Sequence, residues 1–158
     1  MKLDALIDFY QTLTLESVAR FGDFYADNAY FKDPFNEVRG LSAIRRIFTH
    51  MFEQVQVPRF VITEKVGAGE MECPAAGTAM LVWEFTFRIR TLGTNQAMIM
   101  RGVSHLRFDS TGKVDYHRDY WDTAEELYMK LPVIGSLMRG LRKALAGSRH
   151  DKTCGDRK

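Results

Sequence analysis

His117 and Asp119 are the residues of this sequence whose types and spacing best suit proton-transfer chemistry. They stand two positions apart, so a β-strand would present both side chains on one face of a sheet. An imidazole beside a carboxylate can take up and release protons near neutral pH. A histidine and an aspartate on a strand are also a common structural pair. Two interpretations therefore stay open: a catalytic pair, or a structural pair whose hydrogen bonds are satisfied inside the protein.

Asp33 is the third candidate for catalysis, and it stands directly before Pro34. A carboxylate at the end of a strand can act as a general base at the mouth of a pocket. Asp before Pro is equally typical of a turn that ends a strand, and both interpretations stay open. Asp33, His117 and Asp119 together could supply three metal ligands, but no further His or Cys spacing supports a metal, and none is expected.

Alternation of apolar and polar residues predicts the strands that carry this chemistry. From position 81 to 90 every second residue is apolar, which is typical of a strand with one buried and one solvated face. A return strand at about 97–108 and a last strand at 114–121 follow after short turns. Strands joined in this way predict an antiparallel meander.

Helical spacing of apolar residues predicts the elements before the meander. Helices are expected at 3–13, from Thr14 to about Tyr25, and from Gly40 to about 57, with a short strand at 29–33 between the last two. A further strand is expected at 60–66. This order predicts an α+β fold, in which a curved antiparallel sheet packs on N-terminal helices.

The C-terminal part of the sequence predicts two more helices, at 124–130 and 132–145, and a disordered tail at 148–158. Residues 1–147 are then expected to form one domain. Basic residues accompany the apolar stripe of the last helix (Arg139, Arg142 and Lys143). We prefer packing of this helix within the protein or across a dimer to contact with a membrane surface.

Composition narrows the classes of protein that fit. The 158 residues carry a net charge of only +2, so we expect no nucleic-acid partner. Cys73 and Cys154 lie far apart, which argues against a disulfide framework and favours a cytoplasmic protein. No signal peptide or membrane span is expected. The Gly-x-Gly at Gly67 lacks a third glycine and a following helix, so no dinucleotide cofactor is expected. No other cofactor is expected either.

Two segments resemble a known family. The run from Tyr25 to Phe35, followed by Gly40 and a helix, resembles the NTF2-like superfamily, closest to its ketosteroid-isomerase and SnoaL-like branches. Leu106 to Val114, followed by Tyr120-Trp121, is similar to that family's last two strands. The resemblance spans roughly residues 5–122. It implies a cone of curved sheet with a ligand pocket at its open end and, in many members, a dimer formed through the sheet.

The resemblance also assigns roles to individual positions. The isomerases' general base falls on Asp33, and their oxyanion-hole tyrosine falls on Phe9, with Tyr10 one place away. Their protonated oxyanion-hole aspartate, a carboxylic acid kept neutral so that it can donate a hydrogen bond, falls on Ser104. Because Ser104 lacks that acidity, the resemblance implies a related pocket put to another use.

The predicted site combines these positions with the strand faces. Trp121 is expected to point inward, and Asp119 and His117 then share its face. The aromatic residues of the strand at 81–90 (Trp83, Phe85 and Phe87) are expected to form core and, in part, the wall of the pocket. The predicted catalytic residues are Asp33, His117 and Asp119, and the predicted pocket residues are Tyr10, Phe31, Trp83, Phe85, Gly102, Ser104 and Trp121.

The sequence thus predicts a protein that binds a small apolar ligand. The first hypothesis is an acid/base isomerase, cyclase or hydratase acting on a carbonyl-bearing or polycyclic compound. The alternative is a non-catalytic ligand-binding or regulatory module of the same fold. A homodimer is expected in either case.

Overall fold

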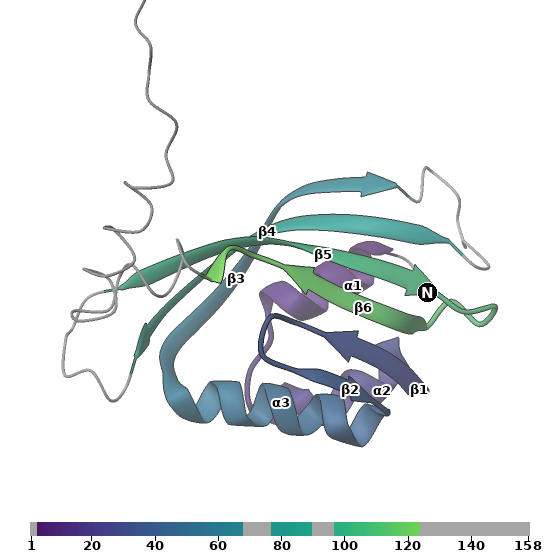
Figure 1. The fold of residues 1–158 in the computed structure, drawn as a ribbon, viewed down its shortest axis with the longest axis horizontal. Helices are drawn as coiled ribbons and strands as arrows, with labels where there is room; N and C mark the ends of the chain where they lie inside the picture. The colour runs from purple at the N-terminus through teal and green to yellow at the C-terminus, as the bar shows by residue number, and fades with distance from the viewer. Residues whose placement is uncertain (1–2, 68–76, 90–96, 124–158) are drawn as a thin grey trace, which may run out of the picture.

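The computed structural model describes residues 3–67, 77–89 and 97–123 (Figure 1). Several predictions lie outside the described residues: most of the loop after Gly67, the hairpin loop at 91–95, the C-terminal helices at 124–145 and the tail at 148–158.

Three short helical segments open the chain: α1 (Leu3–Gln11), the 3₁₀ helix η1 (Glu16–Arg20) and α2 (Phe21–Phe24). They are followed by β1 (Tyr25–Lys32), β2 (Glu37–Arg39) and α3 (Leu41–Gln54). The remaining strands are β3 (Val55–Gly67), β4 (Thr78–Ile89), β5 (Met98–Phe108) and β6 (Val114–Tyr120).

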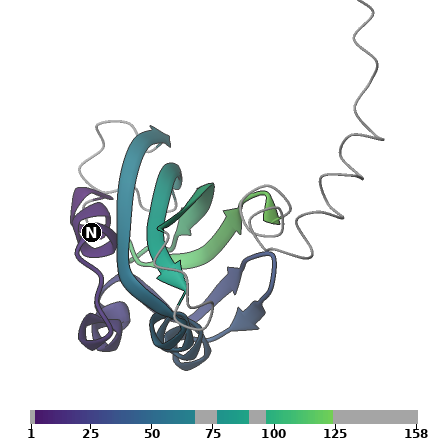
Figure 2. The same ribbon diagram turned by 90° about the vertical axis from the view of Figure 1, so that its left-hand side faces the viewer.

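The six strands form one sheet in the order β2-β1-β6-β5-β4-β3. Neighbouring strands are antiparallel except β1 and β6, which run parallel. Figures 1 and 2 show the sheet curving around the helices, which lie on its concave side. The predicted α+β fold and the meander β4-β5-β6 are confirmed.

The predicted second helix, from Thr14 to about Tyr25, agrees with the helical segments η1 and α2, which end at Phe24. The strand that follows begins earlier than predicted, because β1 starts at Tyr25, whereas the sequence predicted a strand from 29. Tyr25 pairs with Val114 at the start of β6, a partner far away in the sequence. Pairing with a distant strand here overrides the local helical spacing. The three-residue strand β2 was not predicted because it is too short to show a pattern.

Two apolar clusters make up the described core. The larger joins the helices to β1, β4, β5 and β6, and its fully buried members include Leu6, Phe21, Tyr25 and Ile44. The second lies along β3, β4 and β5 and is built from Val55, Trp83, Phe85, Phe87 and Met100. The polar residues His117 and Ser104 are also buried. Their side chains therefore require hydrogen-bond partners inside the protein.

Candidate functional site

His117 lies on the concave face of β6 with only 2% of its surface exposed. Val114 is also buried on this face, although a spacing of three residues would put the two on opposite faces of a regular strand. An irregularity in the pairing of β6 with β5, between Arg107 and Phe108, gives β6 the extra residue Asp115. This bulge turns His117 inward.

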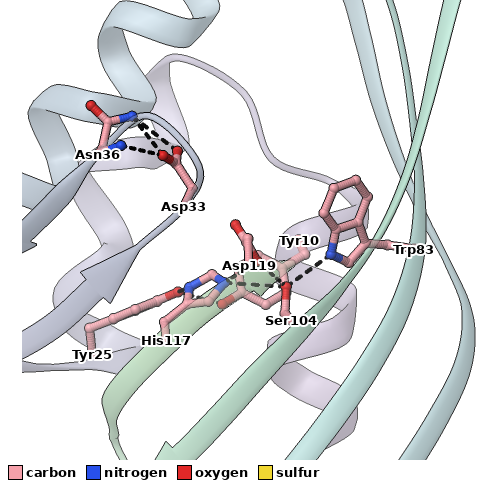
Figure 3. Close-up of polar contacts among 8 residues, drawn as sticks. All are labelled: Tyr10, Tyr25, Asp33, Asn36, Trp83, Ser104, His117 and Asp119. Carbon is pink, nitrogen blue, oxygen red and sulfur yellow. Dashed lines mark hydrogen bonds and ion pairs between the residues drawn. The ribbon is translucent and has the colours of Figure 1, made fainter. Parts of the chain in front are cut away.

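Both ring nitrogens of His117 have hydrogen-bond partners (Figure 3). Nδ1 lies 2.5 Å from the phenolic oxygen of Tyr25. Nε2 lies 2.8 Å from Oδ1 of Asp119 and 3.2 Å from Oγ of Ser104. The imidazole is therefore held from both sides, and neither nitrogen is left to contact a ligand directly.

Ser104 links Asp119 to the indole of Trp83. It lies on β5 directly opposite Asp119 in the strand register, and its hydroxyl is 2.5 Å from Asp119 Oδ1. The indole N–H of Trp83 donates to the same hydroxyl at 3.0 Å. Because the indole can only donate, the serine oxygen accepts from Trp83, and its own hydrogen is free to go to Asp119.

Two buried tyrosines continue the network on the other side of His117. The phenolic oxygens of Tyr10, on α1, and Tyr25, on β1, lie 2.5 Å apart. Burial raises the pKa of Tyr25 well above its usual value, and Tyr10 and the charge of Asp119 raise it further. Burial also raises the pKa of Tyr10, against the opposing effect of its bond with Tyr25. Both side chains are therefore neutral phenols that keep their hydrogens.

One arrangement of the hydrogens, with Asp119 ionised and the His117 ring neutral, gives every group of this network a partner. An ionised Asp119 can only accept, so His117 Nε2 donates to it. In a neutral ring Nδ1 is then the acceptor, and the hydroxyl of Tyr25 donates to it. Tyr10 donates in turn to Tyr25. Every hydrogen has an acceptor, and the donors on both sides converge on Oδ1 of Asp119.

Asp119 is the member of the network that reaches the surface. Its side chain is 16% exposed, compared with 3% for His117. Within the described residues, the hydrogen bonds of this carboxylate all go to Oδ1, so Oδ2 keeps its accepting capacity. It borders a surface hollow of about 490 Å³, here named the Asp119 hollow. The hollow is lined by Lys32, Asp33, Pro34, Arg118, Asp119, Tyr120, Trp121 and Asp122.

Asp33 borders the same hollow but lies outside the network around His117 (Figure 3). Its Oδ1 accepts from the backbone N–H of Phe35 at 2.7 Å and of Asn36 at 2.5 Å. The side-chain amide of Asn36 donates to both carboxylate oxygens. These bonds stabilise the turn between β1 and β2. A catalytic role for Asp33 stays a prediction, beside a structural role that the turn explains fully.

The predicted pocket residues divide into two groups. Tyr10, Ser104 and Trp83 belong to the network, and Phe31 packs edge-on against His117 with ring centroids 4.9 Å apart. Phe85, Gly102 and Trp121 do not hydrogen-bond to the network. Phe85 lies in the second apolar cluster, Gly102 lies against the Trp83 ring, and Trp121 packs on that cluster and edge-on to Phe35.

Tyr25 is the network residue that the sequence did not predict. The burial pattern at the start of β1 is two buried residues, two exposed and one buried, because pairing with β6 is irregular between Tyr25 and Tyr30. Strict alternation is absent there, so no periodic signal identifies Tyr25 as a strand residue.

Among the described residues, no group of three or more His, Cys, Asp or Glu side chains could hold a metal ion. In that same part of the chain, no helix is long and apolar enough to cross a membrane.

The curved six-stranded sheet and the helices on its concave side match an NTF2-like fold. The model of the SnoaL-like domain family matches residues 6–117. The chain therefore belongs to the SnoaL-like domain family, as its sequence resemblance implied. Among curated proteins, no match to the chain was found.

Solved structures with this fold are similar in shape and distant in sequence. A hypothetical protein from Catenulispora acidiphila with a ketosteroid isomerase-like fold has a TM-score of 0.62 at 13% identity, over 79% of this chain and 88% of the other. A putative SnoaL-like polyketide cyclase from Jannaschia also has a TM-score of 0.62, at 14% identity over 78% and 84%. An LEH-like epoxide hydrolase from M. tuberculosis has a TM-score of 0.58 at 17% identity, over 88% and 84%. At these identities the similarity establishes the fold alone.

Proposed function

We propose that this protein binds a small apolar molecule in the Asp119 hollow and catalyses proton transfer on it, as an isomerase, cyclase or hydratase does. One observation carries the proposal. Asp119 stands at the edge of the hollow with Oδ1 held by His117 and Ser104 and with no hydrogen bond to Oδ2 in the described part of the chain. A carboxylate held by two donors and left with one free oxygen suits a general base.

This proposal reassigns the roles expected from the sequence. Asp119 replaces Asp33 as the proton acceptor, because the carboxylate of Asp33 is engaged by the turn at Asn36. His117 holds Asp119 through Nε2–H and touches no substrate, since it is almost fully buried. Trp121, with Phe35 packed on its edge, provides the apolar wall that an apolar ligand would contact.

The tyrosine end of the network limits the type of reaction. A proton taken up by Asp119 could leave through His117 only if Tyr25 and Tyr10 passed a hydrogen onward. Tyr10 is 7% exposed, and its hydroxyl has Tyr25 as its one partner among the described residues. The path therefore ends in the core. The proton on Asp119 returns to the substrate or to water at the hollow, which suits isomerisation, cyclisation or hydration.

A positive charge at the hollow complements the base. The guanidinium of Arg118 lies 4.6 Å from the centre of the Tyr120 ring, and both residues line the hollow. Withdrawing a proton beside a carbonyl group creates an oxyanion, and a nearby cation stabilises it. Among the similar structures, one is described as a polyketide cyclase and one as an epoxide hydrolase, which supports small-molecule chemistry at the level of class.

The test is deuterium exchange into 2-tetralone, an apolar bicyclic ketone, in D₂O, followed by NMR. The full-length protein should accelerate exchange beside the carbonyl, and Asp119→Asn should lower that acceleration by about 10²- to 10⁴-fold, the usual contribution of a general base. Asp8→Asn, an exposed residue on α1, serves as the matched control and should leave the rate unchanged.

Two other outcomes would decide against this assignment. A loss of exchange in Asp33→Asn with normal exchange in Asp119→Asn would make Asp33 the base. If 2-tetralone and cyclohexene oxide, the corresponding probe for hydration, both bind without being converted, the non-catalytic binding module becomes the better description.

We also propose that two copies of the chain associate through the convex face of the sheet. Tyr30 of β1 and Tyr116 of β6 stack there with ring centroids 5.3 Å apart, and the Arg107 guanidinium lies 4.1 Å from the centre of the Tyr116 ring. Met80 and Ile99 are each 38% exposed on the neighbouring strands. Tyrosine, arginine and methionine are the residue types enriched at protein interfaces.

A further inference from the structure

We infer that Tyr25 is a positioning residue: its hydroxyl hydrogen bond to Nδ1 fixes His117 as the neutral tautomer with hydrogen on Nε2, and thereby directs that hydrogen at Asp119. The idea that Asp119 is held in this way for catalysis rests on the proposed function, whereas the tautomer itself does not. Tyr25 lies on β1, 92 residues before His117, so its pairing with the histidine exists only in the folded protein.

The other neutral tautomer does not fit the observed contacts. With hydrogen on Nδ1, Nε2 would turn an unshared electron pair toward Asp119 Oδ1 at 2.8 Å. Two acceptors at that distance repel each other unless a hydrogen lies between them. Ser104 does not relieve this conflict, because its single hydrogen is directed to Asp119 and its oxygen accepts from Trp83.

The protonated ring fits the contacts poorly as well. An imidazolium would donate from Nδ1 to Tyr25, which would then have to donate to Tyr10. The hydrogen of Tyr10 would be left without an acceptor among the described residues, inside a core where an unmade hydrogen bond is costly. The neutral ring with hydrogen on Nε2 is the arrangement that satisfies every group.

Tyr10 acts one step further away. By donating to the Tyr25 oxygen, it leaves the Tyr25 hydrogen free to point only at Nδ1 of His117. Burial raises the pKa of both phenols, so neither loses its hydrogen at neutral pH. Removing the Tyr10 hydroxyl should leave the bond between Tyr25 and His117 in place, whereas removing the Tyr25 hydroxyl deletes the only donor to Nδ1 among the described residues.

The experiment is ¹⁵N NMR of the histidine rings in the full-length protein at pH 7. The chain has four histidines, and the His117 signals are assigned by their loss in His117→Gln. The wild type should show an unprotonated Nδ1 and a protonated Nε2. In Tyr25→Phe the minor forms of the ring should rise by about fivefold to about 150-fold, the factor that corresponds to about 1–3 kcal/mol for a buried acceptor left unpaired.

Two further variants make the test specific. Tyr10→Phe should keep the wild-type tautomer. Tyr30→Phe removes a hydroxyl from the same strand, where it donates to Glu37 on the convex face, and should change nothing at His117. A wild-type ring with hydrogen on Nδ1, or an unchanged tautomer population in folded Tyr25→Phe, would overturn the inference. Because the NMR readout needs no substrate, a failure of Asp119→Asn to affect exchange would refute the proposed function and leave this inference standing.

Discussion

Gly102→Ala would place a methyl group directly against the ring of Trp83. A Cβ at position 102 would lie 2.4 Å from Cζ2 and 2.5 Å from Cη2 of Trp83, and 2.9 Å from the backbone oxygen of Tyr120. The Trp83 ring is rigid, and its N–H is held 3.0 Å from Ser104 Oγ. The ring must therefore move, and its hydrogen bond to Ser104 must lengthen or break.

The expected cost has two parts. Forcing a methyl group into a packed core costs about 1–3 kcal/mol. The loss of the indole hydrogen bond adds about 0.5–1.5 kcal/mol. A total of about 1.5–4.5 kcal/mol lowers the melting temperature of a domain of this size by roughly 3–18 °C. Tryptophan fluorescence should change at the same time, because Trp83 is one of only two tryptophans in the chain.

Thermal unfolding followed by circular dichroism measures the cost, and two variants control for it. Gly22→Ala places a methyl group 3.1 Å from Arg45 Nη2 and 3.3 Å from Leu41 Cδ2, both at the ends of side chains, and should cost less than about 1 kcal/mol. Trp83→Phe removes the two ring atoms that the new methyl group meets. In that background Gly102→Ala should cost at least about 1 kcal/mol less, and the difference measures the coupling between the two positions.

Melting of Gly102→Ala at the wild-type temperature with unchanged fluorescence would contradict this prediction. An equal cost of the substitution in the presence and absence of the Trp83 ring would contradict it as well. In either case the approach of Trp83 to β5 would not require the absence of a side chain at Gly102.

The other predictions concern the outer parts of the sheet. Thr111 and Lys113 donate to Asp109 Oδ1 in the turn between β5 and β6, and the Thr111 bond in particular lowers the pKa of Asp109 below its ordinary 3.8. A lowered pKa stabilises the fold above the unfolded-state pKa, and this stabilisation is lost as the pH falls through the folded-state pKa. Asp109→Ala should therefore lower the melting temperature at pH 7, and the gap to wild type should narrow toward pH 2.5; an equal gap at both pH values would contradict the prediction. For the proposed dimer, light scattering should give twice the chain mass of 18.2 kDa for the wild type and a smaller mass for Met80→Lys, whereas a wild-type monomer would exclude the dimer.

The strand pattern of the sequence was sufficient to predict much of the fold. Alternation along β4 predicted its buried face, and the same two-residue period predicted that His117 and Asp119 share one face of β6. These predictions held because a β-strand alternates its side chains whatever its neighbours are. Where alternation is interrupted, as at the start of β1, the sequence predicted the strand only from residue 29, four residues after it begins.

The candidate site, like the fold, was predicted only in part from the sequence. The sequence identified Asp33, His117 and Asp119 by residue type, but it did not rank them. The turn at Asn36 engages the carboxylate of Asp33, and this could be suspected from the Asp-Pro pair alone. The spacing of His117 and Asp119 predicted that these two residues could pair, but not that Ser104 holds the same carboxylate, because that contact depends on strand register.

By itself, the sequence determined the type of fold, the inward face of β6 and the presence of a histidine and an aspartate on that face. Only the tertiary structure decided which hydrogens those two residues carry. Tyr25, Ser104 and Trp83 come from three other strands, and each supplies a single hydrogen to the network. The direction of a hydrogen bond depends on all of the donors and acceptors that surround a buried group, and these are brought together only when distant strands pair.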